Sequence, residues 1–336
     1  LAHVVQQSAA PAVTLRRDWA EAAAATLDPT SRAAAIVPRM LRVQPFFALH
    51  GPPGTGKSTV TSLVTAAMLR AEPGSRILVS AQCHAALDEL AQKIVAKLRR
   101  DTFDVQAIRI AAGEQDVKPR MREFLLKRQA DERARRIERR ADQMRSDPDL
   151  SPAVRALLGQ WREDVPRALP EIEDRLRRGA NLVFATCGTA TAERLGVQSE
   201  YDLFDYVFVE EAAKAWPTEV MMPLVLGMRW VLVGDHKQLS AYRRDDASRL
   251  LAACETAADS SLHAHGVRRD LYEEVFDFFE RFFADGPTDA VDVLDMQFRM
   301  RKPIAEVVSK AFYAGALRTS PSTEVAVPSK VPWANC

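Results

Sequence analysis

The segment GPPGTGKS, residues 51–58, contains the first side chains whose types and spacing could do chemistry, since it matches GxxxxGK[ST] in full. Glycines let such a loop curve so that successive N–H groups face negative charge. The lysine of the pattern reaches the β- and γ-phosphates of a nucleotide, and the final hydroxyl ligates Mg²⁺. An apolar run precedes the loop and a helical pattern follows it, which disfavours a chance glycine-rich turn. We therefore expect a phosphate-binding loop (P-loop) formed by Gly51, Pro52, Gly54, Thr55, Gly56, Lys57, Ser58 and Thr59.

Two adjacent carboxylates, Glu210 and Glu211, follow the apolar run YVFV. A P-loop needs a carboxylate at the end of a neighbouring strand, so we expect Glu210 to hold Mg²⁺ together with Ser58. Glu211 is then the residue that polarises the attacking water. Asp205 begins the same strand, roughly 16 Å from Glu210 at the usual rise per residue, and is a poor substitute.

A third apolar run ends in VLVGDHKQL and brings Asp235, His236 and Gln238 to the same predicted edge. An amide at that edge can sense the γ-phosphate, so Gln238 is a catalytic candidate. For His236 a structural or solvent-exposed role competes with catalysis. No further ligand stands at metal spacing around it, and four scattered cysteines form no CxxC pair, which argues against a zinc site or a disulfide framework.

Alternating strand-like and helical segments must position these groups. From Phe46 onward, apolar runs of strand length alternate with amphipathic helical stretches, which predicts an α/β fold with a parallel sheet covered by helices on both faces. Residues 1–26 read as a helical lead-in and 27–290 as the main domain. The aromatic stripe of residues 271–283 is expected to pack against the sheet rather than to stack on bases.

Residues 114–179 interrupt this alternation with a charged helical hairpin inserted in the main domain. Between Lys118 and Arg140 there are ten Lys and Arg against four Asp and Glu, which fits either a solvated helix face or an arm that contacts phosphates. Apolar side chains at helical spacing predict the seam between the two arms: Ala130, Ala134, Ile137, Ala141 and Met144 in the first, and Val154, Leu157, Trp161 and Val165 in the second.

The 336 residues have 47% hydrophobic content and a net charge of +1, typical of a soluble globular protein. No apolar run approaches the roughly 18 to 20 residues of a membrane span, so we expect no membrane partner and a cytoplasmic or nuclear location. The near-zero charge gives no whole-chain sign of nucleic-acid binding, so any basic surface must be local.

Taken in order, six segments resemble superfamily-one helicases of the up-frameshift and senataxin group. They are GPPGTGKS, ILVSAQCHAALDEL, ANLVFATCGTA, VFVEEAAKA, VLVGDHKQL and LDMQFRMRKPIAEVVSKAFYAGAL, spread over about residues 27–320. The resemblance implies a RecA-like P-loop NTPase that uses ATP and Mg²⁺ and moves 5′ to 3′ along single-stranded DNA or RNA. It also implies contacts to the sugar-phosphate backbone from Ser80, Ala81, Gln82, His84, Thr186, Gly188 and Thr189.

The resemblance assigns three further roles around the nucleotide. Gln238 matches the glutamine that couples to the γ-phosphate, and Arg299 matches an arginine finger from a second motor domain. Phe298 occupies a position expected to stack on adenine, with simple core packing as the alternative.

The chain departs from the family pattern at several positions. Ser31 stands where an adenine-reading glutamine is expected, which puts selectivity for ATP in doubt. Glu210 replaces the familiar Asp, and Lys214 replaces a frequent Gln. Nothing resembles the last two motifs, so we expect residues 291–336 to be only the start of a truncated second RecA-like domain, whose remainder is missing.

These patterns predict the motor core of an ATP-dependent helicase or translocase that hydrolyses ATP with Mg²⁺ and grips single-stranded DNA or RNA. One alternative is a nucleic-acid-binding module that uses ATP as a conformational ligand without productive turnover. Another is the motor part of a nuclease-helicase fusion. Motifs that grip the backbone contain no readable code for the 2′-hydroxyl, so the pattern does not separate DNA from RNA.

Overall fold

The computed structural model describes residue 25 and residues 32–42, 45–100, 105–256, 275–285 and 289–323. Almost all of the expected lead-in, and Ser31, therefore lie outside the described residues. None of the described helices combines the length and apolar character needed to cross a bilayer.

A seven-stranded sheet in the order β3-β4-β2-β5-β6-β1-β7 forms the centre of the structure, and every strand pair in it is parallel. Five of the strands are mainly apolar and are buried along their whole length, as expected of strands covered on both faces. The predicted α/β fold with a parallel sheet is confirmed. The strands are β1 (Phe46–His50), β2 (Ile77–Ala81), β3 (Ala107–Ile110), β4 (Leu182–Thr186), β5 (Tyr206–Glu210), β6 (Trp230–Gly234) and β7 (Val291–Val293).

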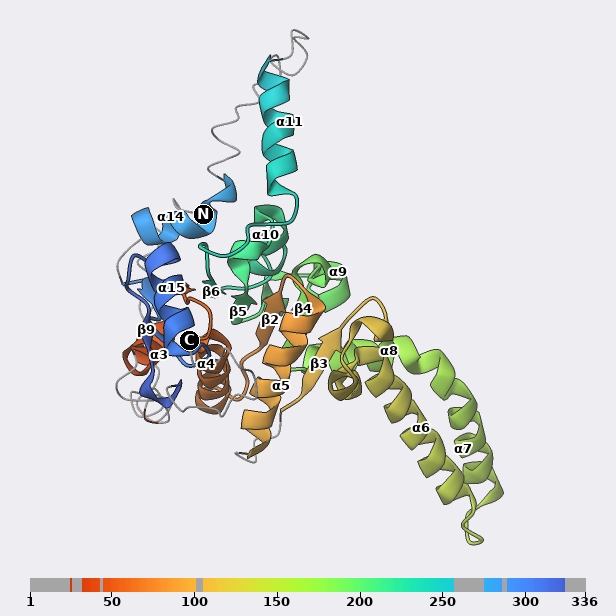
Figure 1. The fold of residues 1–336 in the computed structure, drawn as a ribbon. Helices are drawn as coiled ribbons and strands as arrows, with labels where there is room; N and C mark the ends of the chain where they lie inside the picture. The colour runs from red at the N-terminus through yellow and green to blue at the C-terminus, as the bar shows by residue number, and fades with distance from the viewer. Residues whose placement is uncertain are drawn as a thin grey trace, which may run out of the picture.

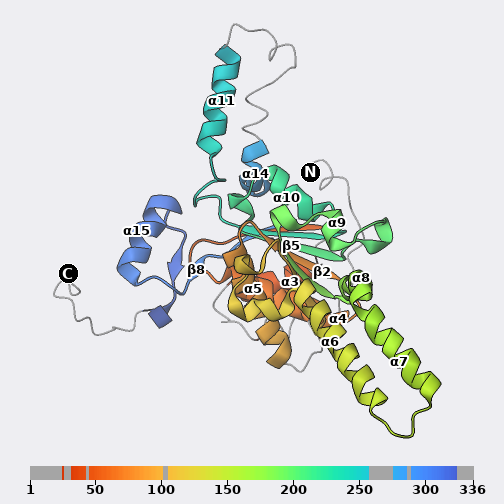
Figure 2. The same cartoon turned by 90° about the vertical axis from the view of Figure 1, so that its right-hand side faces the viewer.

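Helices cover both faces of this sheet (Figure 2). One face packs against α3 (Ala33–Arg42), α4 (Lys57–Ala71) and α5 (His84–Arg100). The other packs against α9 (Ala192–Leu195), α10 (Pro217–Leu224) and α14 (Phe278–Asp285). Alternate residues of each strand point to opposite faces, so Phe47 and Leu49 join the first core and Phe46 and Ala48 the second.

The aromatic stripe expected over residues 271–283 is described from residue 275 onward. Phe279 and Phe282 of α14 are buried against the second face, and the Phe282 ring centroid lies 4.5 Å from that of Phe46. Core packing is therefore confirmed for Phe279 and Phe282, whereas Val275 is 51% exposed. Nearby, α11 (Arg244–Thr256) extends away from the body (Figure 1).

Three α-helices occupy the inserted span between β3 and β4. They are α6 (Leu126–Arg145), α7 (Pro152–Asp164) and α8 (Leu169–Gly179), with short 3₁₀ turns at Glu114–Asp116, Pro119–Phe124 and Val165–Ala168. Both views show α6 and α7 side by side and projecting away from the sheet (Figures 1 and 2). Ser151 caps α7 by accepting from the Val154 N–H, and Pro152 follows at the first helical position.

The predicted seam holds for most of the first arm and is wrong for most of the second. In α6 the three alanines are buried, whereas Met144 is 41% exposed. In α7 the predicted Val154, Leu157 and Trp161 face solvent, and Leu158 is buried instead, with Val165 following in the next turn. This helix has apolar side chains on two faces, so periodicity alone could not decide which face meets α6.

After β7 the chain leaves the main sheet. Residues 291–293, which we expected to open the second unit, pair with β1, so the separate unit begins a few residues later. It contains a two-stranded parallel sheet and α15, followed by a short 3₁₀ turn. These elements are β8 (Met296–Gln297), α15 (Lys302–Phe312), β9 (Arg318–Thr319) and the turn Pro321–Thr323.

Candidate nucleotide-binding site

The glycine loop joins the end of β1 to the start of α4. Gly54 and Gly56 adopt positive φ angles of 77° and 84°, in the region that favours glycine. A Cβ on Gly54 would also lie 2.7 Å from the Cβ of Arg299. Lys57 donates from Nζ to the Gly51 carbonyl at 2.6 Å, and Thr55 Oγ1 donates to the Pro52 carbonyl at 2.7 Å. The loop is therefore held curved by its own hydrogen bonds, with the N-terminus of α4 directed at its concave side.

Glu210 lies directly beside the first turns of α4. Ser58 Oγ donates to its Oε1 at 2.9 Å, and Thr61 Oγ1 donates to its Oε2 at 3.1 Å. The extra methylene of Glu210 relative to Asp is thus accommodated by direct contacts. Burial raises the pKa of Glu210, and the charge of Lys57 and the two hydroxyl hydrogen bonds oppose that shift. Sequence reasoning missed Thr61, which lies one helical turn after Lys57 on the same face.

These donors fit Mg²⁺. The ion prefers hard oxygen ligands and is usually held by one or two protein oxygens together with substrate phosphates and water. Ser58 and Glu210 supply a hydroxyl and a carboxylate within contact of one another. Across the described ranges, no group of three or more His, Cys, Asp or Glu side chains could hold a metal by itself.

Glu211 adopts a left-handed backbone conformation, with φ 57° and ψ 34°. A non-glycine residue in this region stores strain of order 1 kcal/mol, and such residues cluster at functional sites. The 3₁₀ turn Ala212–Lys214 follows at once, and Lys214 Nζ lies 2.9 Å from Glu211 Oε2.

Asp235, at the end of β6, is a buried hub for four donors. It accepts from His50 Nε2 at 2.9 Å, Gln238 Nε2 at 2.7 Å and Tyr313 Oη at 2.7 Å, and from the Lys237 N–H at 3.1 Å. Burial favours a higher pKa for this carboxyl, but the hydrogen bonds from His50, Gln238 and Tyr313 outweigh it and hold the pKa well below its ordinary value. Gln238 is thereby oriented by a group that also contacts α15's C-terminal end.

His236 stacks on His50, with ring centroids 4.5 Å apart, and also lies beside Phe283. Burial, reinforced by the neighbouring His50, lowers the pKa of His236 to about 4. Its ring does not line the cavity described next. Of the two roles considered for His236, the structural one fits this packing.

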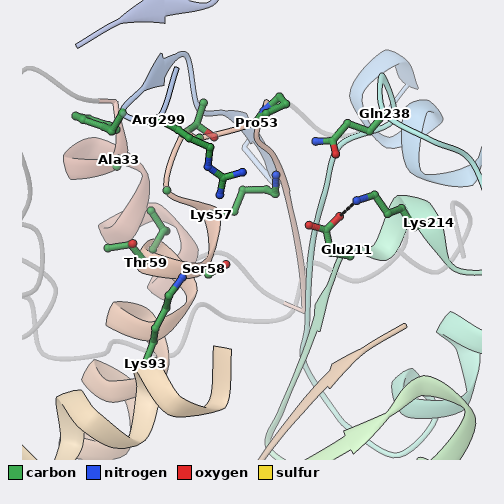
Figure 3. A pocket seen from close by; sticks show the side chains of 15 residues that line it. Ala33, Pro53, Lys57, Ser58, Thr59, Lys93, Glu211, Lys214, Gln238 and Arg299 are labelled. Carbon is green, nitrogen blue, oxygen red and sulfur yellow. Dashed lines mark ion pairs between the residues drawn. The ribbon is translucent and has the colours of Figure 1, made fainter. Parts of the chain in front are cut away.

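A cavity of about 840 Å³ opens above the glycine loop (Figure 3). Its volume is within the usual range for small-ligand sites, about 300–1,000 Å³. Of the predicted residues, Gly51, Pro52 and Glu210 do not line it, although Glu210 accepts from the lining Ser58. Ala33, Pro53, Val60, Lys93 and Lys214 line it without having been predicted as site residues. The predicted residues that line it are Gly54, Thr55, Gly56, Lys57, Ser58, Thr59, Glu211, Gln238, Phe298 and Arg299.

The QFRM segment is docked on the glycine loop. The Phe298 N–H donates to the Gly54 carbonyl at 2.8 Å. Gln297, fully buried, accepts from the N–H groups of Arg299 and Met300 through Oε1 and so fixes this turn. Phe298 is 39% exposed and lines the cavity, which does not fit the core-packing alternative.

The residues expected to contact a nucleic-acid strand gather at the carboxyl ends of β2 and β4, which are paired neighbours. Ser80 has no exposed surface, and its hydroxyl donates to the Ala185 carbonyl at 2.8 Å. The side chains of Ala81, Thr186 and Thr189 are buried too, whereas Gln82 and His84 are partly accessible and Gly188 is exposed. Contacts to a strand remain a prediction for all seven.

Buried Arg109 on β3 bonds to two side chains of α5, next to this edge. Its Nη2 donates to His84 Nδ1 at 3.0 Å, and its Nε donates to Asp88 Oδ1 at 2.9 Å. Both side chains of the Arg109–Asp88 pair have no exposed surface. The ion pair therefore fixes the start of α5, from which His84 projects.

Comparison with known proteins places this geometry in a family. A family model described as an AAA domain (AAA_11) matches residues 27–153 and 140–243. The ATP-dependent helicase NAM7 of Saccharomyces cerevisiae is 29% identical over 294 residues, covering 86% of this chain and 26% of that protein. The DNA-binding protein SMUBP-2 of Rattus norvegicus is 25% identical over 317 residues, covering 88% of this chain and 28% of that protein.

A solved structure, that of an arterivirus nonstructural protein 10 (helicase) with DNA, aligns with a TM-score of 0.40 and 13% identity, covering 85% of this chain and 44% of that one. The chain spans under a third of the length of the curated relatives given above. The family model, however, matches well over half of the 336 residues. The chain therefore belongs to the AAA domain family, among relatives of the up-frameshift type of superfamily-one helicase.

Proposed function

We propose that this chain is the ATP-binding part of a helicase or translocase that hydrolyses ATP with Mg²⁺ and grips single-stranded DNA or RNA. One observation carries the proposal: Lys57, Glu211, Gln238 and Arg299, from four distant parts of the sequence, line one cavity. Glu210 lies behind its wall within hydrogen-bond contact of Ser58. The yeast relative NAM7 is an ATP-dependent helicase, which supports the same activity.

Each group has a place in the reaction. Lys57 and Arg299 present positive charge where the β- and γ-phosphates would lie, and Ser58 with Glu210 would hold Mg²⁺. An ion held by these two side chains would supply positive charge against the negative charge that develops on the phosphate oxygens. Glu211 orients a water whose oxygen forms a bond to the γ-phosphorus as the bond to the ADP oxygen breaks. The water proton passes to the Glu211 carboxylate. Gln238 contacts the γ-phosphate and is bonded to Asp235, so loss of that phosphate changes the contacts of both side chains.

Contacts to nucleic acid are assigned to the adjoining edge at the ends of β2 and β4. Of the seven residues predicted to contact a strand, Gln82, His84 and Gly188 are accessible. Hydrogen bonds from such groups to sugar and phosphate position a strand without reading its bases, as a translocase requires.

Phosphate release measured with and without single-stranded DNA, and separately with single-stranded RNA, tests the proposal. We expect strand-stimulated turnover that falls to background in Lys57→Ala, because the lysine contacts the phosphates throughout the reaction. The larger stimulation identifies the preferred strand. Tight ATP binding with no turnover under either condition would instead support the module that uses ATP as a conformational ligand.

A further inference from the structure

Glu211 and Lys214 form a pair that the proposed reaction does not require. Lys214 is three positions after Glu211, and the 3₁₀ turn Ala212–Lys214 begins directly after the left-handed backbone of Glu211. The Lys214 N–H also donates to the Glu211 carbonyl at 2.9 Å, which closes the turn. The local backbone therefore holds the two side chains against one another.

The Glu211 carboxylate depends on this ammonium group. Oε2 of Glu211 is buried and has no hydrogen-bond partner among the described residues, yet Lys214 Nζ lies 2.9 Å away as an ion-pair partner. The two side chains are 24% and 33% exposed, so water screens the pair only in part. The ion pair therefore holds the carboxylate in one orientation.

Lys214 lies on the side of Glu211 opposite to the phosphate-binding lysine. In Figure 3 the carboxylate lies between Lys57 and Lys214, and the dashed ion pair points away from the glycine loop. The phosphates of a bound nucleotide would face Lys57 and the start of α4. Lys214 lines the same cavity, but its ammonium group is paired with the carboxylate at 2.9 Å, on the side away from Lys57.

We propose that Lys214 is a positioning residue that restrains Glu211 and slows ATP hydrolysis. This inference rests on the proposed function, since it needs Glu211 to orient the attacking water. An ammonium group at ion-pair distance competes with that water for the carboxylate oxygens, so the carboxylate must leave Lys214 before it can serve the reaction. The pair sets the rate of turnover without contributing to nucleotide affinity.

The test is steady-state ATP turnover by the full chain, with and without single-stranded DNA, for Lys214→Gln and Lys214→Arg. Removing the charge in Lys214→Gln is expected to raise kcat about two- to fivefold, which corresponds to roughly 0.4–1 kcal/mol, typical of a partly exposed ion pair. The KM for ATP stays within about twofold, and Lys214→Arg keeps the wild-type kcat. Adding Glu211→Gln to Lys214→Gln abolishes the gain, because the effect passes through that carboxylate.

Lys93 offers a matched control. It lines the same cavity but pairs with Glu89 of its own helix, at 3.2 Å, and not with Glu211. Lys93→Gln removes the same charge from the cavity, so a general electrostatic effect would appear there too. We expect no rise in kcat for Lys93→Gln.

Two results separate failure of the restraint from failure of the proposed function. A lower kcat or a raised KM in Lys214→Gln, with Lys57→Ala inactive, would overturn the restraint and make Lys214 a phosphate-binding cation. A wild-type chain that binds ATP without hydrolysing it would refute the proposed function. In that case, ATP turnover by Lys214→Gln would support the restraint. Absence of ATP turnover in Lys214→Gln would overturn the restraint as well.

Discussion

The buried ion pair of Arg109 and Asp88 should dominate the stability of the edge formed by β3 and α5. Asp88→Ala removes the acceptor of the Arg109 Nε–H at 2.9 Å and that of the Lys118 N–H at 2.7 Å. Neither side chain of the pair has any exposed surface, so water cannot replace the lost partner. Removing one member of a buried pair typically lowers the free energy of unfolding by about 3–5 kcal/mol, because an uncompensated charge remains buried. That is a large part of the 5–15 kcal/mol usual for a domain, as an order of magnitude.

Urea denaturation followed by circular dichroism measures this loss. Glu89→Ala is the matched control, since Glu89 is the next residue of α5 and its pair with Lys93 is exposed. We expect that change to cost only about 0.5 kcal/mol. Replacing both partners, in Asp88→Leu with Arg109→Met, should recover most of the stability because no charge is left buried. If Asp88→Ala and Glu89→Ala unfold within about 1 kcal/mol of each other, the buried pair is not the stabilising contact inferred here.

Further predictions concern pH, the glycine loop and the thiols. The pKa of His236 is about 4 in the folded chain against 6.5 ordinarily, so protonation favours unfolding. The free energy of unfolding of the wild type should fall by up to about 3 kcal/mol between pH 6.5 and 4. Denaturation of His236→Asn, measured over the same pH range, should lack this fall. Gly54→Ala should reduce the kcat for ATP turnover at least about tenfold, because a Cβ at φ 77° clashes with the QFRM segment. Gly74 has open space around it, so Gly74→Ala should keep the wild-type kcat in the same assay. Burial raises the pKa of Cys187 to about 11, so peptide mapping after brief alkylation at pH 8 should find exposed Cys83 modified and Cys187 spared; equal labelling would contradict its burial.

The nucleotide cavity could be predicted because parallel strands bring their carboxyl ends to one edge. The ends of β1, β5 and β6 follow recognisable apolar runs, and each is succeeded by polar residues of the expected type. Adjacency in the sheet then converts distant positions such as Lys57 and Glu211 into neighbours. The sequence pattern was therefore sufficient for the location of the cavity and for most of its lining.

Other contacts of the site and its surroundings could not be predicted, because they depend on how helices pack rather than on local sequence patterns. Asp88 and Arg109 resemble ordinary surface charges, and only the packing of α5 on the sheet buries both. The bond from Tyr313 to Asp235 joins residues 78 positions apart and depends on where α15 docks. Lys93 enters the cavity because α5 packs beside α4, which no motif announces.

The segment after β7 is fastened to the nucleotide site at two points. Its backbone bonds to the Gly54 carbonyl through the Phe298 N–H at 2.8 Å, and its Tyr313 hydroxyl bonds to Asp235 at 2.7 Å. Between these anchors lies α15, a helix of 11 residues. A rotation of that helix would therefore displace the glycine loop and Asp235, the partner of Gln238, at the same time.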